Sequence, residues 1–303
     1  MGGGERRRPP PRPPSALIDG GGSLHPLIRA RRPLGQPTRG KTAPNRLRKT
    51  DAFLAIAFPG FVRGLPGLYV DLGFGAAPVT SVETLRRLRR LDPAVSVLGV
   101  EIDPARVAAA QPFAEPGLEF RLGGFELPLR PGERAAVVRA FNVLRQYGEA
   151  AVAGALAALA GGLAPGGLVL EGTSDPSGRL LAFDLHRKAD GGGLEPLGLV
   201  LAPTLRPDFH PRRLQPVLPK SHIHRAEPRG AVDRFFAAWE ASWQSARRHG
   251  GEPRRTFVES AHELAGRHGY ALDRRAALLR RGFLWLGPTW PAPAAEATAG
   301  CLP

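Results

Sequence analysis

Cysteine is almost absent from this sequence of 303 residues, in which Cys301, near the C-terminal end, is the only one. No disulfide can therefore form within the chain, and a zinc site built from cysteine thiolates is excluded. The sequence also lacks an uninterrupted run of about 18 apolar residues, the length that a membrane-spanning helix needs. Its first ten residues, MGGGERRRPP, lack the apolar segment of a secretory signal peptide. These absences predict a cytoplasmic protein with no membrane partner.

Acidic residues and lysine are scarce relative to arginine. The chain has 27 acidic and 42 basic residues, a net charge of +15, and 38 of the basic residues are arginine. Residues 1–50 hold twelve basic and two acidic residues, a net of +10, so the other 253 residues carry only +5. Residues 1–40 are also rich in proline and glycine, a composition that cannot offset the entropy cost of ordering. We therefore predict a disordered basic arm over 1–40, which leaves RNA open as a partner.

Short apolar runs alternate with longer periodic segments from residue 68 onward, a pattern typical of α/β domains with a mostly parallel sheet and helices on both faces. A helix is expected after Asn45, a good N-cap residue, and another after Asp103, which precedes Pro104. The other expected helices cover 81–91 and 149–163. Strands are expected at 68–72, 95–101, 118–122, 135–141 and 167–171, followed by a hairpin of 179–186 and 197–201.

The character of the sequence changes after residue 203. We predict a C-terminal helical extension over 203–287, with a helix around Phe235 and Trp239, a second helix at 256–268 and a last strand at 282–287. Residues 288–303 are predicted to be a disordered tail. Segment 220–224 contains Lys220, His222 and His224, and the two histidines would present their imidazoles on one face of a strand. The segment could bind the acceptor, bind a metal ion through the histidine pair or be an ordinary surface segment. No metal site is predicted.

The most informative segment is 70–78 (VDLGFGAAP), in which a buried strand runs into a glycine loop and then a helix. Gly73 and Gly75 would let the backbone pass close to a ligand, and Glu101 ends the second strand 26 residues later, where a carboxylate can bind both hydroxyls of a ribose. A dinucleotide site would want a third glycine where the chain has Pro78. Asp71 would repel a diphosphate, so the pattern favours a ligand with a nucleoside and a cationic group.

Residues 70–75 (VDLGFG) and 98–103 (LGVEID) resemble the first and second motifs of the class I S-adenosylmethionine (SAM)-dependent methyltransferases. The resemblance covers about residues 45–175 and implies a Rossmann-like fold, SAM as cofactor and a SAM-binding domain over 41–202. It also implies that the methionine end lies near Asp71 and the glycine loop, the ribose at Glu101, and the adenine against Ile102 and the loop 123–126. The residues implied to bind the cofactor are Asp71, Gly73, Phe74, Gly75, Glu101, Ile102, Phe125 and Asn142.

The methyl acceptor is harder to predict. The Asn-Pro-Pro-Tyr motif of methyltransferases that act on adenine or guanine amino groups is absent after the fourth strand, where the chain reads FNVLRQY (141–147). This favours a small-molecule acceptor, with a C-terminal extension that covers its side of the site. Segments 38–48 and 218–225 resemble an uncharacterised bacterial subgroup of the family. RNA methylation guided by the basic arm and a non-catalytic SAM- or nucleotide-binding module remain the alternatives, and the catalytic residue and oligomeric state stay unknown.

Overall fold

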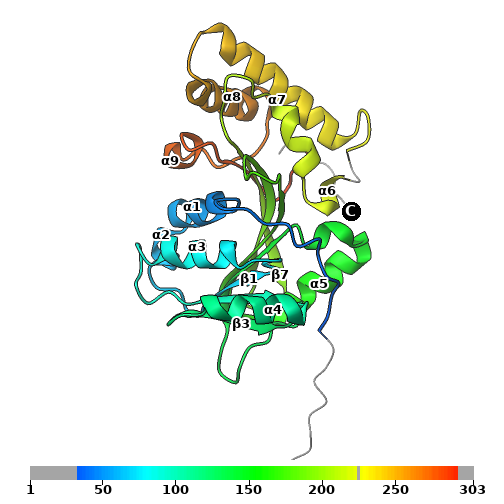
Figure 1. Cartoon of the computed structure of the whole chain (residues 1–303). Coiled ribbons are helices and arrows are strands. Elements are labelled where there is room, and N and C mark those ends of the chain that lie inside the picture. Colours follow the sequence, from blue (N-terminus) through cyan, green and yellow to red (C-terminus); the bar gives the residue numbers. More distant parts are fainter. Residues whose placement is uncertain (1–32, 224–225, 293–303) are drawn as a thin grey trace, which may run out of the picture. The chain divides into compact units, whose positions relative to one another are not determined.

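The fold is built around one mixed sheet (Figure 1). A computed structural model describes residues 33–223 and 226–292. Its strands lie in the order β3-β2-β1-β4-β5-β6-β7-β8. Their bounds are β1 Leu68–Leu72, β2 Val97–Glu101, β3 Leu118–Leu122, β4 Ala135–Phe141, β5 Leu163–Ser174, β6 Leu180–Lys188, β7 Leu194–Pro203 and β8 Leu284–Leu286.

The first five strands run parallel, and they contain the predicted binding motifs. β1 pairs with β2 on one side and with β4 on the other, so the chain reverses its direction of travel across the sheet at β1. Such a switch point opens a crevice at the carboxyl ends of the strands, where ligands of open α/β sheets bind. The inner strands β2 and β4 are fully buried and mostly apolar, as expected of strands covered on both faces, whereas the edge strand β3 alternates between buried and exposed residues.

The other half of the sheet is antiparallel. β6 pairs with β5 and β7, and β8 joins the far edge of β7. The hairpin expected at 179–186 and 197–201 is confirmed as β6 and β7, although both strands are longer than predicted. β5 also begins earlier than expected, because residues 163–166 continue directly from the preceding helix into the strand.

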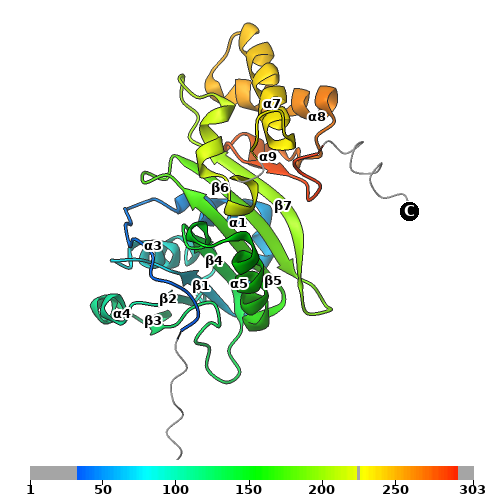
Figure 2. The same cartoon turned by 90° about the vertical axis from the view of Figure 1, so that its right-hand side faces the viewer.

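Helices cover both faces of the sheet, as Figures 1 and 2 show. One core contains buried side chains of α1 and α3, including Phe53 and Leu85, and the opposite core contains those of α5, including Leu159. In this half of the chain the helices are α1 Arg48–Ala57, α2 Pro59–Val62, α3 Val79–Leu88, α4 Pro104–Ala110, η1 Gln111–Phe113, η2 Leu144–Gln146 and α5 Glu149–Gly162.

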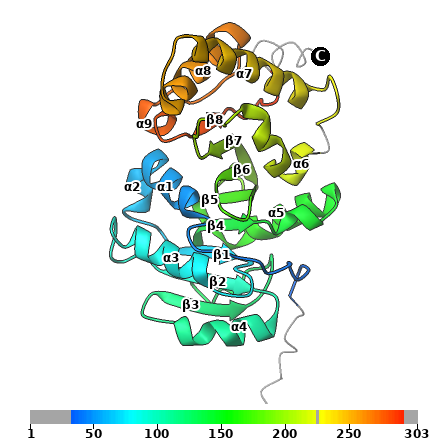
Figure 3. The same ribbon diagram turned by 45° about the horizontal axis from the view of Figure 1, so that its top comes forward.

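The C-terminal extension packs beside the antiparallel strands (Figure 3). Its aromatic residues Phe235, Phe236 and Trp239 are fully buried in a third core, together with Leu199 and Leu284 of the sheet. The helix predicted around Phe235 and Trp239 is therefore confirmed, and its aromatic side chains form a packing core. The elements of the extension are η3 Pro211–Val217, α6 Lys220–Ile223, α7 Ala231–Arg248, α8 Pro253–His268 and α9 Ala276–Leu279.

Several local predictions are corrected by the structure. Asn45 is not an N-cap, because α1 begins after Leu47 and the Asn45 amide instead donates to the Glu83 carboxylate. His222 lies on the short helix α6 and not on a strand, while His224 lies outside the described residues. Trp290 falls within the predicted tail, but it is only 8% exposed and contacts Phe235, because its indole completes the third core.

The described residues contain no helix that is both long and apolar enough to span a bilayer. Most of the predicted arm and tail, at 1–32 and 293–303, lies outside the described residues. Residues 33–40, also assigned to the arm, contact the loops that follow β1, β3 and β4 and so lie along the carboxyl edge of the parallel strands. We call this segment the strap.

Candidate functional site

The glycine loop lies at the switch point, directly after β1. Gly73 and Gly75 have φ values of +73° and +88°, which side chains other than glycine rarely adopt. A Cβ atom on Gly75 would also lie 2.8 Å from the carbonyl oxygen of Gly40 in the strap. That carbonyl accepts a hydrogen bond from Ala76 N at 2.9 Å. The loop therefore needs its glycines both for its turn and for its contact with the strap.

Glu101 ends β2 beside this loop and is 1% exposed. Its Oε2 accepts a hydrogen bond from Gly75 N at 3.0 Å, and its Oε1 accepts from Ile102 N at 2.9 Å and from Asp103 N at 3.3 Å. An ionised carboxylate has about four acceptor positions, and these amides fill three of them. Arg106 Nη1 lies 3.6 Å from Oε2 as an ion-pair partner, so a ligand hydroxyl would share the fourth position with it. Asp103 itself caps α4 by accepting from Ala105 N and Arg106 N, which confirms its predicted structural role.

A small cavity separates Glu101 from the strap. Its volume is about 20 Å³, room for about one water molecule. The rings of Phe125 and Tyr147 meet edge to face at 5.4 Å on its wall. It is lined by Leu34, Gly35, Gln36, Thr38, Leu72, Gly73, Glu101, Ile102, Gly123, Gly124, Phe125, Val143 and Tyr147.

The strap closes this cavity through hydrogen bonds to the loops of the site. Leu34 N donates to Glu126 Oε2 and Leu34 O accepts from Phe125 N, at 2.9 and 3.0 Å. Gln36 N donates to the hydroxyl of Tyr147. The composition of residues 33–40 does not reveal these contacts, because they are made by backbone groups.

A larger cavity of about 620 Å³ adjoins the small one, with which it shares Leu72, Gly73 and Thr38. Arg39, Lys41, Arg46 and Arg145 are among its lining residues, so its charge is mainly positive. The remaining lining residues are Gly40, Thr42, Leu47, Asp71, Phe74, Gly75, Thr80, Phe141, Asn142, Gln146, Ser174 and Pro176.

All eight predicted cofactor residues therefore line one or both of these adjoining cavities. Their side chains differ in how much they are free to bind. The Phe74 ring packs into the core at 5.3 Å from the Phe120 ring. Asn142 has a φ of +59° and exchanges two hydrogen bonds of 3.2 Å with Ser174, which fixes its amide at the end of β4.

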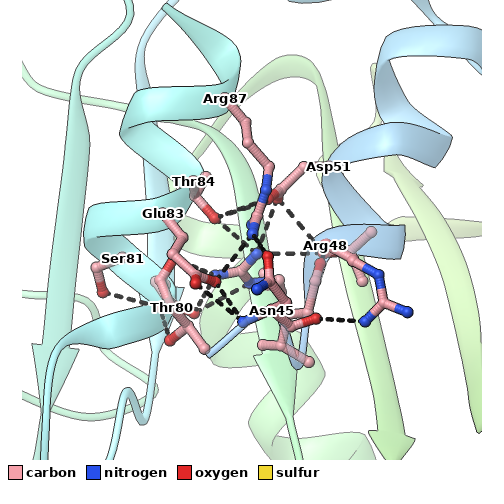
Figure 4. A network of polar contacts seen from close by, with 12 residues as sticks. Asn45, Arg48, Asp51, Thr80, Ser81, Glu83, Thr84 and Arg87 are labelled. Carbon is pink, nitrogen blue, oxygen red and sulfur yellow. Dashed lines mark hydrogen bonds and ion pairs between the residues drawn. The ribbon is translucent and has the colours of Figure 1, made fainter. Parts of the chain in front are cut away.

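Asp71 belongs to a buried polar network, of which Figure 4 labels Asp51, Thr80, Ser81 and Thr84. Its Oδ2 accepts hydrogen bonds from the hydroxyls of Thr80 and Ser81 at 2.7 and 2.8 Å. Its Oδ1 lies 3.1 Å from Nε of Arg139, which is fully buried in the middle of β4. The Asp71 carboxylate therefore anchors the glycine loop to α3 and β4, and its charge is neutralised from within.

Arg139 also connects this network to α1. Its Nη1 donates to Asp51 Oδ1 at 2.9 Å and to the Thr84 hydroxyl at 2.8 Å. Burial alone lowers the pKa of the Arg139 guanidinium, but the carboxylates of Asp71 and Asp51 outweigh it and raise the pKa above its usual value. The sequence analysis missed this network. A charged residue within the apolar run AAVVRAF was the available signal, because an arginine is almost never buried without a partner.

Segment 39–49 holds five basic residues, but three of them donate hydrogen bonds to the protein itself. Arg48 donates to the carbonyl oxygen of Asn45 at 2.8 Å. Arg46 donates to Ser174 Oγ at 2.9 Å and to the carbonyl oxygen of Lys41 at 2.6 Å. Lys49 Nζ donates to the carbonyl oxygens of Arg179 and Ala202 at 2.7 and 2.8 Å. These donors hold α1 and the strap end against the sheet.

Lys49 makes stability depend on pH. Burial lowers the pKa of its ammonium group to about 7, and Arg48 adds to the effect while Asp175 opposes it. An unfolded lysine titrates near ~10.4, so between these pH values the unfolded state holds a proton that the folded state lacks. The free energy of unfolding should therefore rise with pH above 7, by at most about 1.4 kcal/mol per pH unit from this site.

The free energy of unfolding of wild type should rise between pH 7 and 9 relative to that of Lys49→Met, because methionine cannot titrate. Urea unfolding of both proteins across this range measures it. A difference that stays constant with pH would show that Lys49 is fully charged in the folded state.

Within the described residues, no group of three or more histidine, cysteine or acidic side chains is arranged to hold a metal ion. No known family model matches the sequence, and no curated protein matches it. Among solved structures, 316 chains match.

Many of these structures are methyltransferases. One is the magnesium protoporphyrin IX methyltransferase of Synechocystis PCC 6803 with bound SAH, with 20% identity, 42% of this chain and 53% of that chain covered, and a TM-score of 0.32. Another is the SAM-bound amino pentose methyltransferase of Micromonospora echinaspora, with 19% identity and a TM-score of 0.32. The match covers 54% of this chain and 69% of that chain. The third is the N,N-8-amino-8-demethyl-D-riboflavin dimethyltransferase of Streptomyces davawensis, with 21% identity and a TM-score of 0.31. The match covers 42% of this chain and 38% of that chain. The chain thus spans only about half the length of the first.

Proposed function

We propose that the protein is a SAM-dependent methyltransferase that uses the two adjoining cavities at the switch point. The observation that carries the proposal is the position of Glu101, a buried carboxylate at the carboxyl end of β2 that contacts the glycine loop after β1. A carboxylate in this position can accept a hydrogen bond from a ribose hydroxyl. Pro78 at the start of α3, in place of a third glycine, argues against a dinucleotide.

The residues present suit the parts of SAM. Ile102 and Phe125 offer apolar surfaces to an adenine, and the larger cavity has room for the amino-acid part together with an acceptor. When bound, SAM supplies a methyl group activated by the attached sulfonium. The protein's share is to hold the acceptor in line with that group and to exclude water, which can lower the barrier without an obligatory catalytic side chain.

We expect the strap to move aside when SAM binds, because a cavity of about 20 Å³ cannot hold a nucleoside. The amides of Leu34 and Gln36 would then lose their acceptors on Glu126 and Tyr147. Hydrogen exchange of these two amides should become faster on addition of SAM, while that of the β1 amides should not. Unchanged or slower exchange at Leu34 and Gln36 would contradict this movement.

The acceptor that we propose is a small molecule with a carboxylate or phosphate group. Arg39, Lys41 and Arg145 line the larger cavity, and their charged groups make no hydrogen bond or ion pair within the part of the chain that the structure describes. The one acidic residue of the lining, Asp71, is neutralised by Arg139. An anion is therefore the ligand that this surface would stabilise.

Transfer of labelled methyl groups tests the proposal. The protein is incubated with methyl-labelled SAM, below saturation, and either a mixture of small carboxylates and phosphate esters or total RNA. Glu101→Ala, which should bind SAM more weakly, is the comparison. We expect label in small anions. Label in RNA alone would overturn the proposed acceptor but keep the methyltransferase, whereas SAM binding without transfer to either pool would favour a non-catalytic binding module.

A further inference from the structure

A third cavity lies on the α5 face of the sheet and shares no lining residue with the other two. Its volume is about 220 Å³, larger than a cavity of about 150 Å³ that is known to admit benzene. Its floor is formed by β5, β6 and β7, and its walls by α5, α6 and the segment after β8. It is lined by Val152, Leu156, Glu171, Asp184, Leu185, His186, Pro196, Gly198, Leu199, Ser221, His222, Gly287, Pro288 and Trp290.

Glu171 is the unusual residue of this cavity. It lies on β5 directly opposite Asp184 of β6, and it is only 3% exposed. Within residues 33–223 and 226–292, its carboxyl group has no hydrogen-bond or ion-pair partner. Burial, followed by the nearby charge of Asp184, raises the pKa of this carboxyl group well above its usual value. A buried carboxyl group without a partner costs stability, and a ligand that supplies the partner would recover it.

The other polar groups of the cavity do not supply that partner. Asp184 accepts from Ser221 Oγ at 3.3 Å and pairs with His222 Nε2 at 2.8 Å. Burial lowers the pKa of the His186 imidazole, which favours its neutral form. His222 Nδ1 is buried and also lacks a hydrogen-bond partner in the described part of the chain. The cavity therefore offers the Glu171 carboxyl group to a ligand, whereas Asp184 and His222 Nε2 are paired with each other.

The chemistry of the walls restricts the ligand further. The described acidic and histidine residues here are not arranged to hold a metal ion, so a bare cation is not the matching occupant. Leu156, Leu199 and the ring of Trp290 make the rest of the cavity mainly apolar, and the Trp290 indole N–H is buried without a hydrogen-bond partner in the described residues. We propose that this cavity binds a small organic ammonium ion, whose N–H group donates to the Glu171 carboxylate while its hydrocarbon part packs against Trp290 and Leu156.

The proposal is tested by calorimetry with benzylammonium and its neutral analogue benzyl alcohol. We expect wild type to bind benzylammonium at least tenfold more tightly than benzyl alcohol. Binding should also release a proton to the buffer, because the ammonium ion favours ionisation of Glu171. Glu171→Gln keeps the shape of the cavity but should abolish both the preference and the proton release. Glu195→Gln, which changes a half-exposed carboxylate of β7, should behave like wild type.

Equal affinity of wild type for the two compounds would overturn the proposal, as would an unchanged preference in Glu171→Gln. If that variant does not fold, as judged by its thermal unfolding, the comparison of the two compounds on wild type alone decides. SAM affinity should be the same in wild type and Glu171→Gln, because the cavities do not overlap. This ammonium site therefore stands or falls independently of the methyltransferase proposal.

Discussion

Replacing Arg139 with methionine should lower the free energy of unfolding by about 3–5 kcal/mol, the usual cost of removing one partner from a buried ion pair. The substitution leaves Asp71 and Asp51, which are both 2% exposed, without the guanidinium that joins them. Because Asp71 anchors the glycine loop, SAM binding should weaken as well. Urea unfolding followed by circular dichroism gives the stability.

Arg87→Met is the matched control for this prediction. Arg87 also pairs with Asp51, at 2.9 Å, but its side chain is 25% exposed. Its loss should cost only about 1 kcal/mol, in keeping with partly exposed pairs. A triple variant, Arg139→Met with both aspartates changed to asparagine, should recover part of the loss, because no unpaired buried charge remains. A free energy of unfolding for Arg139→Met within about 1 kcal/mol of the wild-type value would show that the network does not hold the glycine loop.

Replacing Glu101 with alanine should weaken SAM binding by about 1–3 kcal/mol, or roughly 5- to 150-fold in Kd, which is the value of a hydrogen bond to a charged acceptor. The carboxylate also accepts from Gly75 N and Ile102 N, so part of the loss would come from a looser loop. Calorimetric titration with SAM measures the change.

Asp103→Ala provides the control, since Asp103 lies two residues away but its carboxylate caps α4. This variant should lose about 1 kcal/mol of stability and keep its affinity for SAM. Glu101→Gln, which retains one acceptor oxygen, should fall between wild type and Glu101→Ala. If Asp103→Ala and Glu101→Ala weakened SAM binding equally, the end of β2 would affect SAM affinity through the stability of the fold and not through contact with the ligand.

The parallel half of the sheet could be predicted because its strands are short, mainly apolar segments separated by turn and helix signals. β1, β3 and β4 coincide with the predicted ranges, and the β6–β7 hairpin differs only at its ends. The N-terminus of α1 could not be predicted from capping preference, because Asn45 donates to Glu83 of α3, a contact 38 residues away in sequence. Tertiary contacts of this kind override local preferences.

The candidate site could be predicted where residue type and strand position carry the signal, as for Glu101 and the glycine loop. The strap could not, since backbone groups of Leu34 and Gln36 make its contacts whatever their side chains are. Glu171 was read only as the end of a strand. Its proximity to Asp184 depends on the antiparallel register of β5 and β6, which no sequence pattern specifies.

Titration of wild type with SAM and, separately, with NAD tests the central claim most directly. Both ligands carry an adenosine, but NAD also carries a diphosphate, which would meet the tight turn at Gly75 and Pro78 in place of a third glycine. We expect SAM to bind with a Kd in the micromolar range and NAD to bind much more weakly. Binding of NAD in preference to SAM, or of neither ligand, would contradict the assignment of this site to a methyltransferase.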